Sequence, residues 1–228
     1  MKVTTHGEHL VKMTRQRWVN GYLVREEDGF TVVDTLIGGS ADSIINAARE
    51  HGGEIRRVAL THAHGDHVGS VDALVEQLPG LEVLISTRDA RFTRGDKSLD
   101  PEEQKGKVRG SWKTLTNQPT RTFEPGERIG SLEVVGAPGH TPGHVAFLDT
   151  RDRTLIAGDA FVTLGGMATS AKGTWRFPVV ATATWHKPTA LDSARELRGL
   201  DPSRLAVGHG PVVENPVKGM DEAILRGS

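Results

Sequence analysis

Short apolar runs separated by turn residues recur along the whole chain, and each run has the length of a β-strand. The pattern predicts eight strands: Trp18–Val24, Phe30–Asp34, Ile55–Leu60, Glu82–Ile85, Leu132–Val135, Val145–Leu148, Thr154–Ala157 and Leu205–Val207. Asp28 and Gly29 lie between the first two runs and are typical of a hairpin turn. Strands are therefore expected throughout the chain.

Helices are marked by their end residues. Capping and stop signals predict five of them: Ser40 to Glu50, Asp66 to Leu78, Asp100 to about Leu115, Thr189 to about Arg198, and Asp221 to Arg226. Thr189 with Asp192 three residues later resembles a capping box. Helices thus lie between some of the strands.

Two stretches do not fit the pattern of a packed core. Residues 88–119 are charged, and residues 162–187 hold aromatic side chains among small and polar ones. Long segments of this kind form lids or binding loops, or else lie on the surface without a binding role. No repeat or Pro/Ser-rich linker interrupts the chain, so we expect a single domain over residues 1–228.

The amino-acid composition limits the classes of binding partner that we expect. Lys and Arg total 28 and Asp and Glu total 29, a net charge of −1, which does not point to nucleic acid or an anionic membrane. Cysteine is absent, which excludes disulfides, a catalytic thiol and thiolate metal ligands. The N-terminus has no apolar signal core, and we expect a cytoplasmic protein with a small-molecule substrate. The oligomeric state is not predicted.

Four residues with metal-binding side chains lie within a single stretch of six. His62, His64, Asp66 and His67 follow a buried-looking strand and open a helix. On an extended segment His62 and His64 point to the same side, and the turn at Gly65 brings the other two round. Imidazole and carboxylate are ligands that suit zinc and other divalent metals. The stretch therefore indicates a metal site.

Three further candidates each lie just past a predicted strand, beside glycine. They are His140 in Gly139–His144, Asp159 after Gly158, and His209 between Gly208 and Gly210. Glycine permits the tight turns and close approach that such a site needs. The repeated arrangement supports one shared site.

With these motifs the sequence resembles the metallo-β-lactamase superfamily, from about Trp18 to Pro211. The resemblance implies an α/β fold, an αβ/βα four-layer sandwich of two mixed sheets with external helices. It also implies two divalent metal ions, usually zinc, with iron and manganese as alternatives. By position, His62, His64 and His140 bind the first ion, Asp66, His67 and His209 the second, and Asp159 bridges both.

The resemblance further implies a metal-dependent hydrolase. A hydroxide bridging the two metals attacks an ester, thioester, lactone or related bond of a small molecule, and Asp66 orients it or moves its proton. The ligand set is that of glyoxalase II; Asp159 and the lack of cysteine argue against a β-lactamase. A single-iron oxidoreductase of the persulfide dioxygenase type and a non-catalytic metal-binding module remain alternatives.

Several other residues have open roles. His144 is expected to support a ligand or pack a strand, and Asp34 to orient a ligand or end a strand. His186 lies in the 162–187 excursion, where it contacts substrate or only the surface. The remaining candidates for pocket lining or lid packing are Trp175, Phe177, Trp185 and Arg91.

Overall fold

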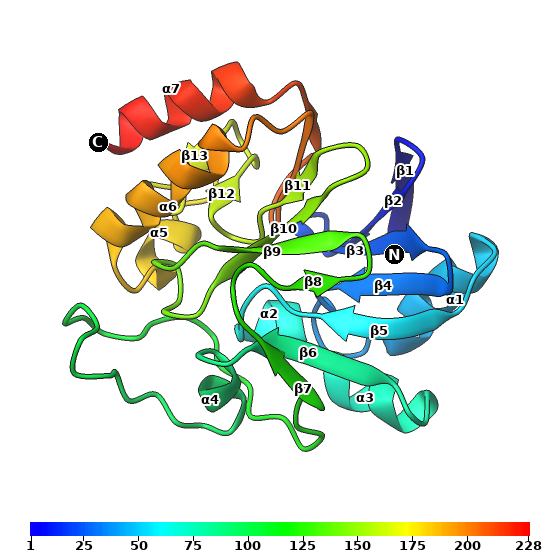
Figure 1. The fold of residues 1–228 in the computed structure, drawn as a ribbon. Coiled ribbons are helices and arrows are strands. Elements are labelled where there is room, and N and C mark those ends of the chain that lie inside the picture. The colour runs from blue at the N-terminus through cyan, green and yellow to red at the C-terminus, as the bar shows by residue number, and fades with distance from the viewer. The chain divides into compact units, whose positions relative to one another are not determined.

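The computed structural model describes residues 1–228 and divides into two compact units. Unit 1 consists of Met1–Gly95 and Ser111–Phe123, and unit 2 of Asp96–Gly110 and Glu124–Ser228. Each unit contains one large sheet together with helices (Figure 1). The chain is thus mixed α/β with two large sheets, as expected, while a single domain over the full length stays a prediction.

The sheet of unit 1 has seven strands that follow one another in sequence order, from the blue β1 to the green β7 in Figure 1. They are β1 (Lys2–His6), β2 (Leu10–Arg15), β3 (Val19–Glu26), β4 (Gly29–Val33), β5 (Ile55–Ala59), β6 (Glu82–Ser86) and β7 (Arg121–Phe123). Pairing is antiparallel from β1 to β4 and parallel from β4 to β7. Strands β4 and β6 are buried almost throughout, as parallel strands covered on both faces are.

Four helices belong to unit 1: α1 (Ala41–Glu50), α2 (Gly65–Val68), α3 (Val71–Gln77) and α4 (Ala90–Thr93). Helix α1 buries Ile44, Ile45 and Ala48, which recur with the helical period, and exposes Asp42. It packs against α3. The two short helices flank the strand ends where the candidate ligands lie.

The sheet of unit 2 has six strands in the order β15-β14-β11-β10-β9-β8. Their bounds are Arg128–Ile129 for β8, Leu132–Gly136 for β9, Val145–Asp149 for β10, Thr154–Ile156 for β11, Arg204–Ala206 for β14 and Val213–Glu214 for β15. Strands β11 and β14 pair in parallel and the other neighbours antiparallel. A separate hairpin joins β12 (Phe161–Val162) to β13 (Ala168–Thr169).

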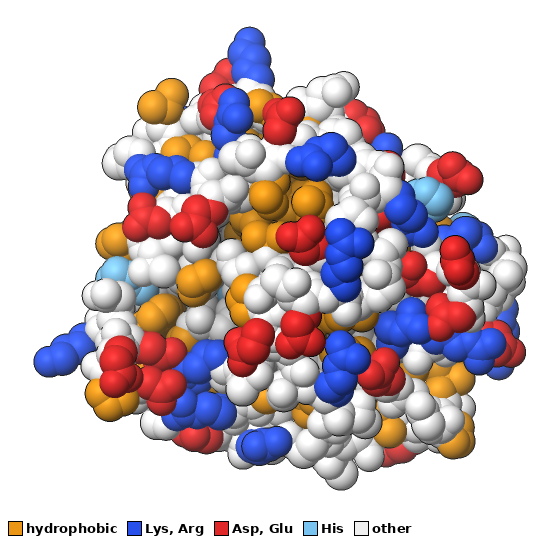
Figure 2. Space-filling view, in the orientation of Figure 1, with side chains coloured by type: hydrophobic (Ala, Val, Ile, Leu, Met, Phe, Trp, Pro, Cys, Tyr) orange, Lys and Arg blue, Asp and Glu red, His pale blue; other side chains and the backbone are white.

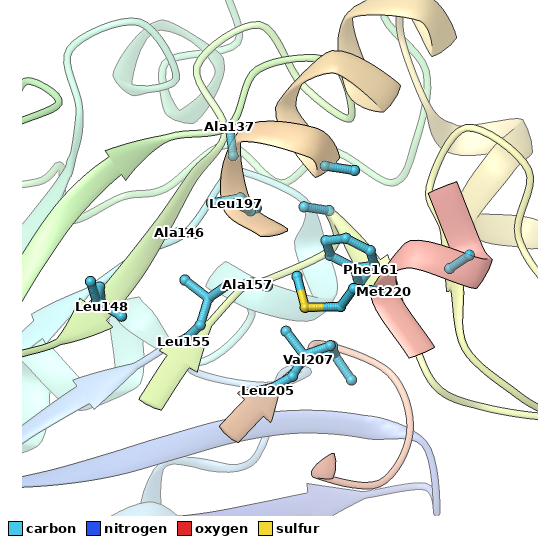
Figure 3. Packing of buried hydrophobic residues seen from close by; sticks show 13 residues of the cluster. Ala137, Ala146, Leu148, Leu155, Ala157, Phe161, Leu197, Leu205, Val207 and Met220 are labelled. Carbon is cyan, nitrogen blue, oxygen red and sulfur yellow. The ribbon is translucent and has the colours of Figure 1, made fainter. Parts of the chain in front are cut away.

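The core of unit 2 lies between this sheet and two helices. Unit 2 contains α5 (Val179–Ala183), α6 (Lys187–Gly199) and α7 (Val217–Gly227), and α6 packs beside α7. Figure 3 shows the side chains of Leu155 and Leu205 from the sheet with Leu197 of α6 and Met220 of α7 in one buried cluster. This packing places β11 and β14 at fixed positions in the unit.

The eight predicted strands are all present, and the Asp28–Gly29 turn joins β3 to β4. The predicted helix from Asp66 to Leu78 is split between α2 and α3, because the Gly69 N–H bonds the Leu36 carbonyl and the Ser70 N–H bonds the Thr35 hydroxyl instead of the preceding helical turn. Helix α6 begins before Thr189, and the ring of His186, not a capping box, accepts a hydrogen bond from the Thr189 N–H.

The predicted helix from Asp100 to Leu115 is wrong. One turn forms, in which the Glu103 N–H bonds the Asp100 carbonyl, and no helix continues. Gly106 packs so close to the Trp185 ring that an added Cβ would lie 3.1 Å from the indole nitrogen, and Gly110 has a φ of 110°. Glycines in these roles break a helix that lacks an apolar stripe.

Every helix of the chain falls short of the length and apolarity that crossing a membrane requires.

Candidate metal centre

In unit 1 the four clustered candidates lie where β5 leads into α2. His62, His64 and His67 are buried, with at most 3% of their surface exposed, and Asp66 in the first turn of α2 is half-buried. Leu60 continues the strand through a bond from its N–H to the Leu84 carbonyl. The sequence therefore brings these side chains together through one strand end and one helical turn.

The imidazoles of unit 1 face one another closely. Nε2 of His62 lies 3.1 Å from Nδ1 of His64, and the His62 and His67 ring centroids are 4.1 Å apart. Two nitrogens bound tetrahedrally to zinc at 2.0–2.1 Å lie roughly 3.3 Å apart. The His62–His64 spacing therefore suits two ligands of one ion. The pairs His62–His67 and Asp66–His67 also place ligand atoms within 4.8 Å.

Asp34 organises this half of the site. It lies just after β4 in the left-handed region (φ 61°), which aspartate tolerates better than most residues. Its carboxylate accepts bonds from the Thr61 N–H (2.8 Å), the Thr61 hydroxyl (2.8 Å) and Nδ1 of His67 (2.7 Å). Asp34 thus follows the end of β4 and also hydrogen-bonds the candidate ligand His67, so both roles expected from the sequence have a counterpart in the structure.

The bonds around Thr61 define the protons on two rings. The Thr61 hydroxyl gives its proton to Asp34, so its lone pair faces Nδ1 of His62 at 3.0 Å, and that nitrogen carries a hydrogen. Nδ1 of His67 likewise donates to the carboxylate. In the neutral form of both rings Nε2 then carries the lone pair, which is the form that a metal ligand requires.

Sequence reasoning missed two neighbours of this half. The fully buried Asp89, before α4, accepts a bond at 3.0 Å from the N–H of Ala63, between His62 and His64. The Trp112 ring lies 4.5 Å from the His64 ring. Neither residue has a sequence signal near the motif, because both contacts depend on segments distant in the chain.

In unit 2 the parallel register of β11 and β14 aligns two candidates. Ile156 pairs with Ala206, and three residues further on are Asp159 and His209. The register continues beyond the strands, since the Gly208 N–H bonds the Gly158 carbonyl. Residues at equal offsets from parallel partners leave the sheet at the same edge, so these side chains meet.

One carboxylate oxygen of unit 2 faces two imidazoles. Oδ2 of Asp159 lies 3.1 Å from Nε2 of His209 and 3.4 Å from Nε2 of His140, and all three residues are buried. His144 supports them, because its Nε2 accepts the Asp159 N–H at 3.0 Å. A carboxylate between two imidazoles is a donor set that suits a divalent cation.

The 162–187 excursion is in direct contact with these candidates. The Thr184 hydroxyl lies 3.0 Å from Nδ1 of His140, and the Phe177 ring lies 4.7 Å from the His209 ring. Trp185 is buried while Trp175 is 80% exposed. His186 caps α6. The excursion thus packs around the candidate ligands of unit 2.

A mixed α/β chain with histidines and carboxylates gathered at its strand ends has the features of a metal-binding protein. The family model of the metallo-beta-lactamase superfamily matches residues 16–209. The chain belongs to this superfamily, and its fold is the expected one.

Three similar proteins illustrate the relationship. An uncharacterized protein of Bacillus subtilis (strain 168), YobT, is 46% identical over 209 residues, 91% of this chain and 90% of that protein. "Probable metallo-hydrolase YflN" of the same strain is 27% identical over 206 residues, 82% of this chain and 78% of that one. A solved structure of TTHA1623 in a di-iron-bound form is 27% identical with a TM-score of 0.65, covering 90% of this chain and 94% of that one.

Proposed function

We propose that the chain is a metal-dependent hydrolase with a two-metal site. His62, His64 and His140 would hold one divalent ion, Asp66, His67 and His209 the other, and Asp159 would contact both. The observation that carries the proposal is the arrangement within each unit: Nε2 of His62 beside Nδ1 of His64, and one Asp159 oxygen beside two imidazoles. Membership of the superfamily supports joining the two halves.

The donor set fits a divalent metal. It offers imidazole nitrogen and carboxylate oxygen without thiolate, which suits zinc, iron and manganese alike. We favour zinc; the two irons of TTHA1623 make iron the leading alternative. The hydrogen bonds of Thr61 and Asp34 keep His62 and His67 in the tautomer that binds metal.

Two bound ions would supply a hydroxide nucleophile at neutral pH and a Lewis acid for a carbonyl or phosphoryl oxygen. Asp66 is our candidate for orienting the nucleophile and moving its proton. Its half-buried carboxylate, 4.0 Å from Nε2 of His67, is the one member of the unit 1 cluster with partial access to solvent. A group that exchanges protons during turnover needs such access.

We propose a small-molecule ester, thioester, lactone or related bond as the substrate. A net charge of −1 supports this class over a polyanion, and Figure 2 shows basic and acidic side chains interspersed over the viewed face without a continuous basic track. The relative described as a metallo-hydrolase supports hydrolysis.

The test combines metal analysis with turnover. Purified protein is expected to contain two metal equivalents and to cleave at least one member of a chromogenic ester, thioester, lactone and phosphodiester panel. His62→Ala and Asp159→Ala should lose metal and lose more than the roughly 100-fold in activity that an outer partner costs. His6→Ala, on β1, is the matched control.

Three results would overturn the proposal. Full activity in a metal-free preparation would exclude metal hydrolysis. A single iron with oxygen consumption on glutathione persulfide would favour the oxidoreductase. Tight metal binding without turnover on any substrate would favour a binding module.

A further inference from the structure

Thr184, which follows α5, occupies a buried position between two carbonyls and a candidate ligand. Only 4% of its surface is exposed. Its hydroxyl lies 2.8 Å from the Val180 carbonyl, 3.0 Å from the Ser170 carbonyl and 3.0 Å from Nδ1 of His140. All three partners belong to unit 2, so the arrangement is a property of that unit.

Counting protons assigns the direction of each bond. A hydroxyl has one hydrogen to donate, and the two carbonyls can only accept. If the hydroxyl donated to His140, neither buried carbonyl would receive its hydrogen, whereas donation to one carbonyl leaves only the other without it, which costs less. The hydroxyl therefore donates to a carbonyl, its lone pair faces His140, and Nδ1 of His140 carries the hydrogen.

We propose that Thr184 is a positioning residue that holds His140 in the Nδ1–H tautomer, with the lone pair on Nε2. The Asp159 carboxylate, whose Oδ2 lies 3.4 Å from that nitrogen, would favour a hydrogen on Nε2 instead, so Thr184 acts against this competing contact. The inference rests on the proposed function, in which Nε2 of His140 binds the first metal. Thr184 lies outside the histidine motifs and 44 positions from His140.

The backbone on both sides keeps the hydroxyl in place. The Trp185 N–H bonds the His140 carbonyl at 3.0 Å, and the His186 N–H bonds the Gly139 carbonyl at 2.9 Å. These two bonds tie the chain after Thr184 to the chain around His140. The position of the hydroxyl relative to the ring is therefore set by main-chain contacts, which a change of the Thr184 side chain leaves in place.

The experiment reads the tautomer directly. Long-range 1H–15N spectra of the full chain, with zinc and after chelation, distinguish Nδ1–H from Nε2–H, and a His140→Gln spectrum assigns the signal. Wild type and Thr184→Ser should show Nδ1–H, whereas chelated Thr184→Val should shift toward Nε2–H. Thr182→Val is the matched control, because Thr182 is exposed and its hydroxyl bonds the Val179 carbonyl.

Zinc competition against a chromophoric chelator gives the second readout. One zinc equivalent of Thr184→Val should bind about 10- to 100-fold more weakly, the usual effect of losing an outer partner of a metal-binding histidine. Thr184→Ser and Thr182→Val should bind close to wild type.

The outcomes separate the two proposals. If wild type binds no metal, the proposed function fails, while the spectra of the chelated protein still decide the tautomer. If Thr184→Val keeps both Nδ1–H and wild-type affinity, the role of Thr184 is overturned. If that variant does not fold, the wild-type spectrum decides alone, since an Nε2–H signal for His140 contradicts the inference.

Discussion

The two units build their candidate ligands in different ways. Unit 1 presents its candidates within one short stretch, His62 to His67, and holds them with the buried carboxylates Asp34 and Asp89. Unit 2 collects His140, Asp159 and His209 from three separate strand ends. These candidates are contacted by the Thr184 hydroxyl, the Phe177 ring and the His144 imidazole.

The two units also differ in the strength of the hydrogen bonds that hold their candidate ligands. Hydrogen bonds to an ionised carboxylate are roughly twice as strong as those between neutral groups. Unit 1 concentrates its support in Asp34, whereas unit 2 distributes smaller contributions over Thr184, Phe177 and His144. Single substitutions should therefore cost unit 1 more than unit 2, and the following experiments test that order.

The largest effect is expected for Asp34→Ala. The variant removes the acceptor of three buried hydrogen bonds, so the free energy of unfolding should fall by about 3–5 kcal/mol. Urea unfolding measures it, with the exposed Asp42→Ala as the control. Asp34→Asn tolerates the positive φ and separates the backbone contribution from that of the carboxylate. A loss below about 1 kcal/mol would contradict the concentrated support of unit 1.

A smaller effect is expected for His144→Phe. The variant leaves the buried Asp159 N–H without its acceptor, which costs about 1–3 kcal/mol. His144→Gln places an oxygen near the position of Nε2 and should recover part of the loss. Urea unfolding of both variants beside Asp34→Ala compares the units directly. Equal losses for His144→Phe and Asp34→Ala would contradict the expectation that single substitutions cost unit 1 more stability than unit 2.

The fold was predictable where the apolar period was clear. Strands β3 to β6 and β9 to β11 have continuous or alternating apolar runs that identify them. Strands β1 and β2 were missed, because the mixed sequence of Lys2–His6 and the polar residues of Leu10–Arg15 give a weak period. The helix predicted after Asp100 failed because capping residues mark a start but supply no packed face.

The site was predictable to the extent that it is local. The stretch from His62 to His67 can be recognised from residue type and spacing alone. Asp159 and His209 lie at equal distances in sequence from the paired residues of β11 and β14, so strand pairing predicts that they meet. The contacts of Asp89 and Thr184 connect segments 26 and 44 residues apart in sequence. Such contacts form only when distant segments of the chain pack together, so residue type and spacing do not predict them.

A modest effect is expected for Phe177→Leu. An aromatic pair contributes about 0.5–1.5 kcal/mol, so the free energy of unfolding should fall by that amount or less. By proposal His209 binds the second metal, and its zinc affinity should weaken by less than about tenfold. Trp175→Leu, at a position 80% exposed, is the control and should change neither quantity. A larger loss than for His144→Phe would show that aromatic packing dominates unit 2.

The smallest effect is expected at Lys12 on β2, a charge of unit 1 outside the candidate site. Burial, and then the nearby charge of Lys2, lower the pKa of Lys12 to about 8 from its ordinary 10.5. Between pH 8 and 10.5 the unfolded chain therefore binds more protons than the folded one, and this group makes stability rise with pH. Below pH 8 Lys12→Met should stabilise the protein by less than about 1 kcal/mol, because Lys12 is only half-buried and solvent screens its charge. The gain should disappear by about pH 10.5, as urea unfolding across this range would show. If instead Lys12→Met changed stability as much as Asp34→Ala, the support of unit 1 would not be concentrated in Asp34.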